Sequence, residues 1–137
     1  PIERASADFL STGLSPVSSP MQFIRALLQE RGVLTALDLE EARNGSTVKV
    51  AGVVTHRQRP ATAKGTTFVS LEDETGLVNV ICTKGVWDRY RKVARSAKAL
   101  LITGRLERAE GVINLSAKKF ENLSLSLEDH LKARDFR

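Results

Sequence analysis

The amino-acid sequence predicts a mainly β protein: a five-stranded barrel with one helix between its third and fourth strands, preceded by a small helical appendage. Two observations predict this. The apolar residues change from a helical spacing to an alternating one near residue 47. The runs after that point follow the order of three strands, a helix and two strands. We therefore expect a connector with the helical appendage at residues 1–46, the barrel at residues 47–125 and a tail at residues 126–137.

The region before the barrel is predicted to contain two short helices. It includes the Ser-, Gly- and Pro-rich connector "STGLSPVSSP", which cannot pack a core of its own. Ser19 is then expected to cap a helix with Pro20 at its first position, and apolar residues recur at helical spacing after it. A second short helix is expected to start after the capping residue Thr35 and to end near residue 45. We expect both helices to pack on the barrel.

The barrel strands are recognised by alternating apolar residues and by the turns between them. They are "TVKVAGVVTH", "TTFVSLED", "GLVNVICT", "ALLITGRLERA" and "VINLSAKKFENL", and the helix "VWDRYRKVARSA" precedes the fourth. Gly52 is expected at a bend or bulge of the first strand. A split sandwich also has five strands, but this position of the helix favours the oligonucleotide- and oligosaccharide-binding barrel, the OB-fold. The tail "LEDHLKARDFR" is expected to be helical or frayed.

The positive charge of the chain is concentrated in the predicted barrel. The whole chain has a formal net charge of +5. Residues 47–125 hold 14 lysines and arginines against 7 aspartates and glutamates, whereas the other residues hold 7 against 9. This distribution is typical of a protein that binds a polyanion, although a solvated cationic surface has the same composition. No apolar run approaches the ~18 residues of a membrane span, so no membrane partner is expected.

In OB-folds the second and third strands and the loops at their ends form the binding surface. Alternation directs Val69 and Leu71 into the barrel, and it does the same for Val78 and Val80 on the third strand. The outward side chains of these strands then form the predicted binding face: Phe68, Ser70, Glu72, Leu77, Asn79 and Ile81. An outward Phe68 can stack on any nucleic-acid base, and the alternative is ordinary packing at the barrel end.

The loop between the first and second strands is predicted to grip phosphates. It contains His56, Arg57, Arg59 and Lys64. The two arginines can fork onto phosphate oxygens, and Lys64 would act as a point charge. Pro60 restricts the loop, so that less conformational entropy is lost on binding.

The last two strands are predicted to supply cations on the other side of the groove. Arg105 and Arg108 flank the turn between these strands, where they would close the groove. Lys118 and Lys119 are neighbours on the last strand, and a regular strand would direct them to opposite faces. At most one of them, taken as Lys118, is then expected to join the site.

Other notable side chains are better explained by folding than by chemistry. Trp87 and Tyr90 are expected in the core, because the helix that carries them closes a small barrel. The run from Glu72 to Glu74 is interpreted as turn chemistry, since three consecutive carboxylates cannot converge on a metal ion. The cations of the helix are expected on a solvated face: Arg89, Arg91, Lys92 and Arg95.

Nothing in the sequence predicts a catalytic centre. Cys82 is the single cysteine, which excludes an internal disulfide and a Cys-rich zinc site, and we expect it to be a buried strand thiol. The sequence shows no nucleophile–base pair, metal triad or phosphate-binding glycine loop. We therefore expect a binding module with no catalytic residue, metal or cofactor of its own.

The stretch "THRQRPATAKGTTFVSLEDETGLVNVI" resembles the OB domain near the C-terminus of bacterial C-family DNA polymerases, the polymerase III alpha-subunit family. Within that family, "HRQRP", "LEDETGLVN", "LERAEGVINLSA" and the closing "ARDFR" are similar to the error-prone branch that acts in damage-induced mutagenesis. The upstream "TGLSPVSSPMQFIRALLQERGVL" is also similar, although a His-Pro pair is common there and this chain has Ser19-Pro20. The resemblance covers nearly the whole chain.

The resemblance implies a parent protein that is a bacterial, cytoplasmic, DNA-directed DNA polymerase for translesion synthesis in DNA replication and repair. Its palm carboxylates, fingers and PHP domain would lie upstream, so this segment should have no polymerase activity. A first residue of Pro1 instead of Met agrees with a segment of a longer chain. The OB domain would engage single-stranded template DNA near the polymerase or dock accessory proteins of the mutagenesis machinery. We find no clamp-binding motif in the sequence.

Two alternatives to single-stranded DNA binding remain open. An OB adaptor for accessory proteins predicts an exposed apolar patch, with Leu77 and Ile81 as candidates, and weak, salt-sensitive DNA binding. A tRNA anticodon-binding OB domain is the second, because "VAGVVTHRQR", "FVSLED" and "GLVNV" are broadly similar to that class. That class places its OB domain before a large catalytic domain, whereas this sequence ends shortly after the predicted barrel.

Overall fold

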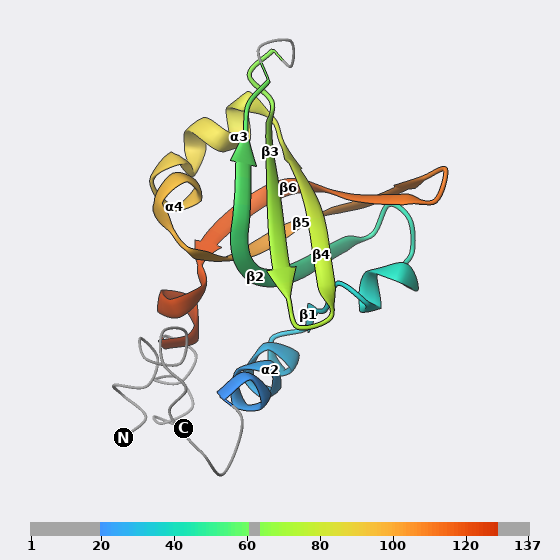
Figure 1. The fold of residues 1–137 in the computed structure, drawn as a ribbon, viewed down its shortest axis with the longest axis vertical. Coiled ribbons are helices and arrows are strands. Elements are labelled where there is room, and N and C mark those ends of the chain that lie inside the picture. The colour runs from blue at the N-terminus through green and yellow to red at the C-terminus, as the bar shows by residue number, and fades with distance from the viewer. Residues whose placement is uncertain (1–19, 61–63, 129–137) are drawn as a thin grey trace.

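The structure of the chain, a computed structural model, describes residues 20–60 and 64–128. Within these residues five strands form a closed barrel, and a short extra strand lies at its edge (Figure 1). The barrel strands are β2 (Thr47–Gln58), β3 (Thr67–Asp73), β4 (Gly76–Cys82), β5 (Ala99–Ala109) and β6 (Val112–Asn122). The predicted OB-fold is confirmed. The predicted cap Ser19, the connector and most of the tail lie outside the described residues.

The barrel closes because β2 pairs with two neighbours. Its second half runs antiparallel to β3 and its first half antiparallel to β5, so that the order β2-β3-β4-β6-β5 returns to β2. Gly52 lies where β2 passes from one partner to the other, and a Cβ at this position would lie 2.6 Å from the carbonyl oxygen of Glu72. Only glycine allows this close approach of two backbones, which explains the bend predicted at Gly52.

Two short helices, α3 (Lys84–Arg89) and α4 (Arg91–Ser96), connect β4 to β5 where the sequence predicts one. The hydroxyl of Thr83 caps α3 by accepting a backbone N–H of its first turn. The helix is interrupted at Tyr90, whose φ of −111° and ψ of 20° are not helical. The predicted position of the helix between the third and fourth barrel strands is confirmed, and the two helices cover one end of the barrel (Figure 1).

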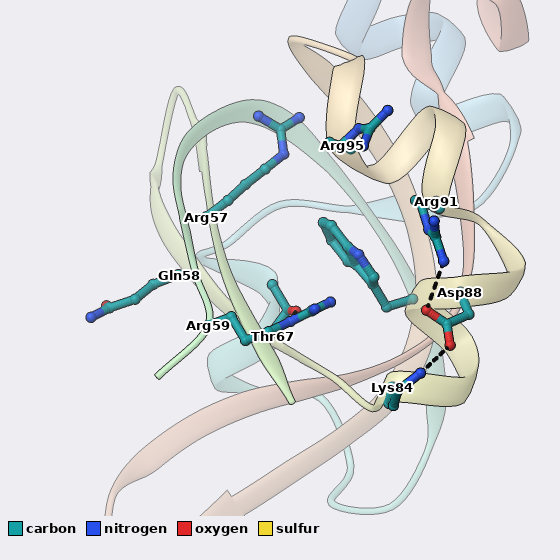
Figure 2. A pocket seen from close by; sticks show the side chains of 9 residues that line it. Arg57, Gln58, Arg59, Thr67, Lys84, Asp88, Arg91 and Arg95 are labelled. Atoms are coloured by element: carbon teal, nitrogen blue, oxygen red, sulfur yellow. Dashed lines mark hydrogen bonds and ion pairs between the residues drawn. The ribbon is translucent and has the colours of Figure 1, made fainter. Parts of the chain in front are cut away.

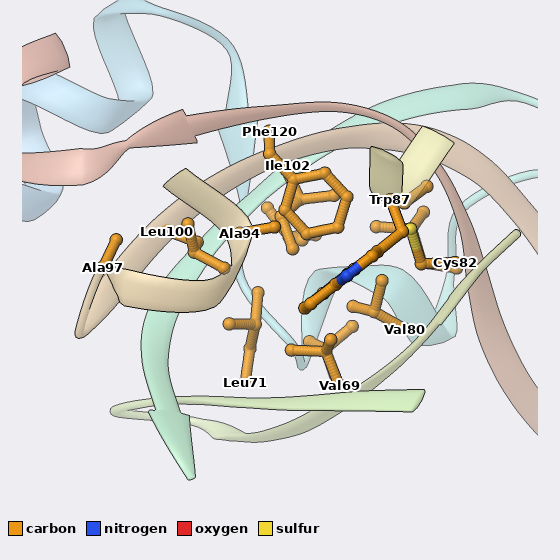
Figure 3. Packing of buried hydrophobic residues seen from close by; sticks show 14 of the residues in the cluster. Val69, Leu71, Val80, Cys82, Trp87, Ala94, Ala97, Leu100, Ile102 and Phe120 are labelled. Carbon is orange, nitrogen blue, oxygen red and sulfur yellow. The ribbon is translucent and has the colours of Figure 1, made fainter. Parts of the chain in front are cut away.

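The main core fills the barrel against these helices (Figure 3). The predicted interior positions are all buried: Val69, Leu71, Val78 and Val80. Trp87 is only 8% exposed and meets Phe120 edge to face, with ring centroids 6.5 Å apart. Its predicted place in the core is confirmed. Cys82 is fully buried in the same cluster, and burial raises the pKa of its thiol to about 11. It is therefore a protonated, structural thiol at neutral pH.

The N-terminal appendage builds a second, smaller core on the outside of the barrel. Here α2 (Pro20–Glu30) and a helical stretch at residues 123–128 cover the outward faces of β2 and β5. The cluster consists of Ile24, Leu27, Leu28, Val33, Ala51, Ala99, Leu101, Leu123 and Leu127. The predicted packing of the appendage on the barrel is confirmed. Within residues 20–60 and 64–128, no helix has the length and apolar character to cross a membrane.

Between α2 and the barrel the structure differs from the sequence-based prediction. An unpredicted strand, β1 (Val33–Leu34), pairs in parallel with β2. The predicted second helix is shorter, a 3-10 turn named η1 (Asp38–Glu40). Thr35 does cap it: the Asp38 N–H donates to its hydroxyl at 3.0 Å, and the Thr35 N–H donates to the Asp38 carboxylate at 3.0 Å. The helix cannot continue because the chain must turn back to start β2 at Thr47.

Polar contacts fasten the appendage to the barrel. The Arg25 guanidinium donates to both carboxylate oxygens of Glu74, at 2.6 and 2.7 Å, in the turn between β3 and β4. Arg31 donates to the hydroxyl of Ser126. The turn itself is held by Asp73, whose carboxylate accepts two backbone N–H groups of the turn at 2.8 and 3.1 Å. The interpretation of the acidic run as turn chemistry is confirmed.

Candidate nucleic-acid interface

The outward side chains of β2, β3 and β4 form two rows of cross-strand partners. One row consists of His56, Ser70 and Asn79, and the next of Gln58, Phe68 and Ile81. The predicted outward direction of Phe68 agrees with its 40% exposure, and Asn79 is exposed as well. An exposed ring beside hydroxyl and amide groups suits a base that stacks on the ring and forms hydrogen bonds along its edge. We call this surface the sheet face.

His56 and Arg57 lie in β2 and not in the predicted loop. The strand continues to Gln58 because it still pairs with β3, where Arg57 lies opposite Val69. Neighbouring side chains of a strand point to opposite faces, so Arg57 shares the inward side with buried Val69 while Phe68 points outward. Arg57 and the Phe68 ring therefore lie on opposite sides of the β2–β3 pair.

An open groove with a volume of about 510 Å³ lies between this end of the β2–β3 pair and the helices α3 and α4 (Figure 2). The lining residues of this helix groove are Arg57, Gln58, Arg59, Thr67, Lys84, Trp87, Asp88, Arg91 and Arg95. They include five cationic side chains and a single carboxylate. In Figure 2 Arg57 and Arg59 extend from the strand side, and Arg91 and Arg95 lie on the helices. The groove is thus strongly positive and polar.

Arg57 and Arg59 are both held in position. The Arg57 guanidinium donates to the carbonyl oxygens of Ala94, at 2.7 Å, and Ala97 at the end of α4. Burial lowers the pKa of Arg57 from its ordinary value. The Arg59 guanidinium lies over the Trp87 ring, with its central carbon 5.8 Å from the ring centroid. Both arginines are therefore ordered before any ligand binds. Lys64 is exposed in a left-handed turn with φ 53°.

Arg91 and Arg95, two of the four helix cations predicted to lie on a solvated face, line the helix groove. Lys84 and Arg91 both approach the carboxylate of Asp88, at 2.7 and 3.5 Å (Figure 2). Among the described residues, the Arg95 side chain makes no hydrogen bond or ion pair. A signal for this cluster does exist in the sequence. Positions 84, 88, 91 and 95 follow the spacing of one helix face, which separates them from Arg89 and Lys92.

Arg108 is used by the fold itself. One of its guanidinium nitrogens donates to three backbone carbonyls around η1, those of Leu39, Glu40 and Ala42, at 2.8 to 2.9 Å. Its backbone N–H donates to the Asn44 side chain at 2.9 Å. This geometry does not favour the predicted role of Arg108 as a cation that closes the binding groove, because the Arg108 guanidinium already donates to the carbonyls of the η1 turn.

Arg105 and Lys118 lie away from both the sheet face and the helix groove. Arg105 is on the outer face of β5 opposite Thr47, three residues before Arg108 and therefore on the other side of the strand. A β-bulge between β5 and β6 adds one residue at Lys118, and both Lys118 and Lys119 are exposed. The expectation of opposite faces for the two lysines fails because the strand is not regular there.

A second depression, of about 590 Å³, lies between η1, β4 and the turn of β5 and β6. Its lining residues are Ala36, Leu39, Glu40, Leu77, Val78, Asn79, Arg108, Gly111, Val112 and Ile113. Leu77 is 62% exposed and Val112 52% exposed, whereas Ile81 is half-buried. The exposed apolar patch expected of a protein-docking OB domain is thus present at Leu77, and Val112 extends it.

Comparisons with known proteins agree with this geometry. Residues 48–123 match the family described as an OB-fold nucleic acid binding domain. The chain is 53% identical over 136 residues to the error-prone DNA polymerase of Nocardia farcinica and 52% identical to that of Mycobacterium tuberculosis. It is 48% identical over 137 residues to the error-prone DNA polymerase of Cutibacterium acnes. The predicted resemblance to error-prone DNA polymerases is confirmed.

These alignments cover 99% of this chain and 12% of each relative, so the chain spans only a small part of the length of those polymerases. A solved structure, the asparaginyl-tRNA synthetase from Pyrococcus horikoshii, is similar with a TM-score of 0.54 and 21% identity. That alignment covers 65% of this chain and 22% of the synthetase. At this level of identity the similarity shows the fold alone.

Proposed function

The chain belongs to the family of OB-fold nucleic acid binding domains and is homologous to one part of error-prone DNA polymerases, and we propose that it binds single-stranded DNA for such a polymerase. In this proposal the domain holds the template strand near the polymerase during translesion synthesis in the bacterial cytoplasm. It does so as a binding module, with the chemistry supplied elsewhere in the parent protein. Identity of 53% to a polymerase and 21% to a synthetase favours this role over tRNA anticodon binding.

The observation that carries the proposal is the sheet face. Phe68 is exposed, with Gln58 and Ile81 as its cross-strand neighbours, and a base has a π-face on which such a ring can stack whatever the sequence. The Ser70 and Asn79 pair lies one row away and offers donors and acceptors to an unpaired base edge. Bases in a duplex are already stacked and paired, so this face suits single strands.

The test is a titration of the protein into a fluorescently labelled single-stranded oligonucleotide of mixed sequence, with a duplex of the same sequence as control. Phe68→Ala is expected to weaken single-strand binding by ~1–3 kcal/mol, because one stacking platform is lost. The dependence of log K on log salt should stay unchanged, since no phosphate contact is removed. Leu125→Ala is the matched control, because Leu125 is 59% exposed and lies outside the sheet face.

Equal binding by the parent and the Phe68→Ala variant would contradict a stacking role for the sheet face. A preference for the duplex would contradict the single-strand proposal as a whole.

A second candidate function, the docking of an accessory protein, is favoured by the apolar depression beside η1. Leu77 and Val112 are more than half exposed there. Leu77→Asn should leave oligonucleotide binding unchanged and abolish the capture of an accessory protein if docking is the main role. Loss of oligonucleotide binding in this variant would instead assign the depression to the nucleic-acid path.

A further inference from the structure

We propose that the helix groove is a second nucleic-acid contact, which binds backbone phosphates of the same strand that stacks on the sheet face. This inference rests on the proposed function and deepens it. It assigns Arg91 and Arg95 of α4, together with Lys84, to phosphate binding. Nucleic acid would then lie on both sides of the β2–β3 pair.

The charge of the groove is the first argument. Five cationic side chains surround a space of about 510 Å³, and Asp88 is the one carboxylate that lines it. Asp88 neutralises part of this charge through Lys84 and Arg91, while Arg57, Arg59 and Arg95 have no carboxylate partner among the described residues. Concentrated positive charge in a concave surface attracts a polyanion more strongly than the same charge on a flat one.

Two arginines of the helix groove are already held in position by the protein. Arg57 is held by two carbonyls at the end of α4, and Arg59 lies over Trp87 while its Nε donates to the Thr67 hydroxyl at 3.2 Å. A guanidinium that is already positioned loses little conformational entropy when it contacts a phosphate. Each of these arginines uses only part of its five N–H donors, so donors remain for phosphate oxygens.

The helix groove also lies directly next to the sheet face. Thr67 lines the helix groove, and the next residue, Phe68, belongs to the sheet face. Adjacent strand residues point to opposite sides, so the two surfaces are separated only by the thickness of the β2–β3 pair. One OB domain covers ~4–16 nucleotides, and the upper part of this range exceeds what a single row of stacked bases on the sheet face requires.

The experiment compares two double variants with the same change in charge. Arg91→Ala with Arg95→Ala removes two cations from the helix groove. Arg89→Ala with Lys92→Ala removes two cations from the same pair of helices, at positions that do not line the helix groove. Labelled single-stranded oligonucleotides of increasing length, from about 6 to about 16 nucleotides, are titrated at several salt concentrations. Arg95→Gln alone is added as a milder variant, because it removes a single exposed charge.

For long oligonucleotides, the groove variant should lose about 1.4 from the slope of log K against log salt, or about 0.7 for each phosphate contact. Arg95→Gln should lose about half of that, and the control variant should match the parent. Binding of the shortest oligonucleotides should be alike in all variants, because they occupy the sheet face alone.

Equal slopes of log K against log salt for the two double variants would overturn the inference. Weaker single-strand binding by Phe68→Ala would in that case still support the proposed function. A parent protein that binds no oligonucleotide at low salt would overturn the proposed function and the inference together.

Discussion

At the end of the barrel covered by α3 and α4, arginines surround an open groove, whereas the arginines near α2 and η1 contact other parts of the protein. Arg59 and Arg95 have no carboxylate or carbonyl partner at the groove end among the described residues. In contrast, Arg25 donates to the Glu74 carboxylate, and Arg108 donates to three backbone carbonyls around η1.

The charge of an arginine therefore does not by itself identify its role. An arginine beside an unsatisfied turn or carboxylate stabilises the fold, and one without such a partner keeps its donors for a ligand. The two groups should therefore respond differently to truncation. Fold-stabilising arginines should lower the free energy of unfolding when replaced, and groove arginines should change binding and leave that free energy almost unchanged.

The largest effect is expected for Arg108→Ala, which should lower the free energy of unfolding by about 2–3 kcal/mol. Three carbonyls around η1 lose their charged donor, and the β5–β6 turn loses its contact with that segment. Urea unfolding followed by tryptophan fluorescence measures the change. Arg105→Ala is the matched control, since Arg105 lies on the same strand with its side chain outward. If Arg108→Ala and Arg105→Ala lower the free energy of unfolding equally, Arg108 is not a fold-stabilising arginine.

Arg57→Ala comes next, with an expected loss of about 1–2 kcal/mol. Arg57 belongs to both groups, because it lines the helix groove and also donates to the carbonyls of Ala94 and Ala97. Removing it leaves the end of α4 without its donor. The change should appear in urea unfolding and as faster amide hydrogen exchange in α4. Arg95→Ala, at the same groove, should stay within about 0.5 kcal/mol of the parent. If the free energy of unfolding is unchanged in Arg57→Ala, Arg57 does not stabilise α4 and serves only to line the helix groove.

The fold was predictable because its signals are local. Alternation placed Val69 and Val80 inside the barrel, Gly52 marked the bend and Thr35 marked a cap, and the structure agrees at each position. The helix interruption at Tyr90 and the two-residue strand β1 were not predicted. The strand β1 depends on its pairing with β2, a contact between separate segments that a local pattern does not contain.

The candidate site was predicted in part for the same reason. Phe68, Ser70 and Asn79 share a face that alternation alone defines. Alternation also separates Arg57 from Phe68 once β2 is known to reach Gln58, but the sequence marks that strand end only weakly. The roles of the other cations depend on tertiary contacts. Arg108 finds three carbonyls that are about 66 to 69 residues away along the chain, and no pattern in the sequence predicts them.

The smallest effect, and the one that depends on pH, is expected for the Arg25–Glu74 pair. The hydrogen bonds from Arg25 hold the pKa of the Glu74 carboxylate below its ordinary value. Because the folded-state pKa is depressed, the pair contributes stability above the unfolded pKa of Glu, near 4.3, and loses it as pH falls through the folded value. The Glu74 side chain is 37% exposed, so solvent screening limits this contribution to about 0.5–1 kcal/mol.

Glu74→Gln should therefore be less stable than the parent by this amount at pH 7, and the difference should shrink as the pH is lowered and the parent carboxyl takes up a proton at its depressed folded-state pKa. Urea unfolding at a series of pH values measures the difference, and its decrease at high salt would support an electrostatic origin. Glu110→Gln is a suitable control, because Glu110 lies in the exposed β5–β6 turn far from Arg25. If the stability difference between the parent and Glu74→Gln stays constant from pH 7 to pH 3, Arg25 holds α2 on the barrel by packing and not by charge. Arg25 would then not belong, with Arg108, to the arginines that stabilise the fold through their charged donors.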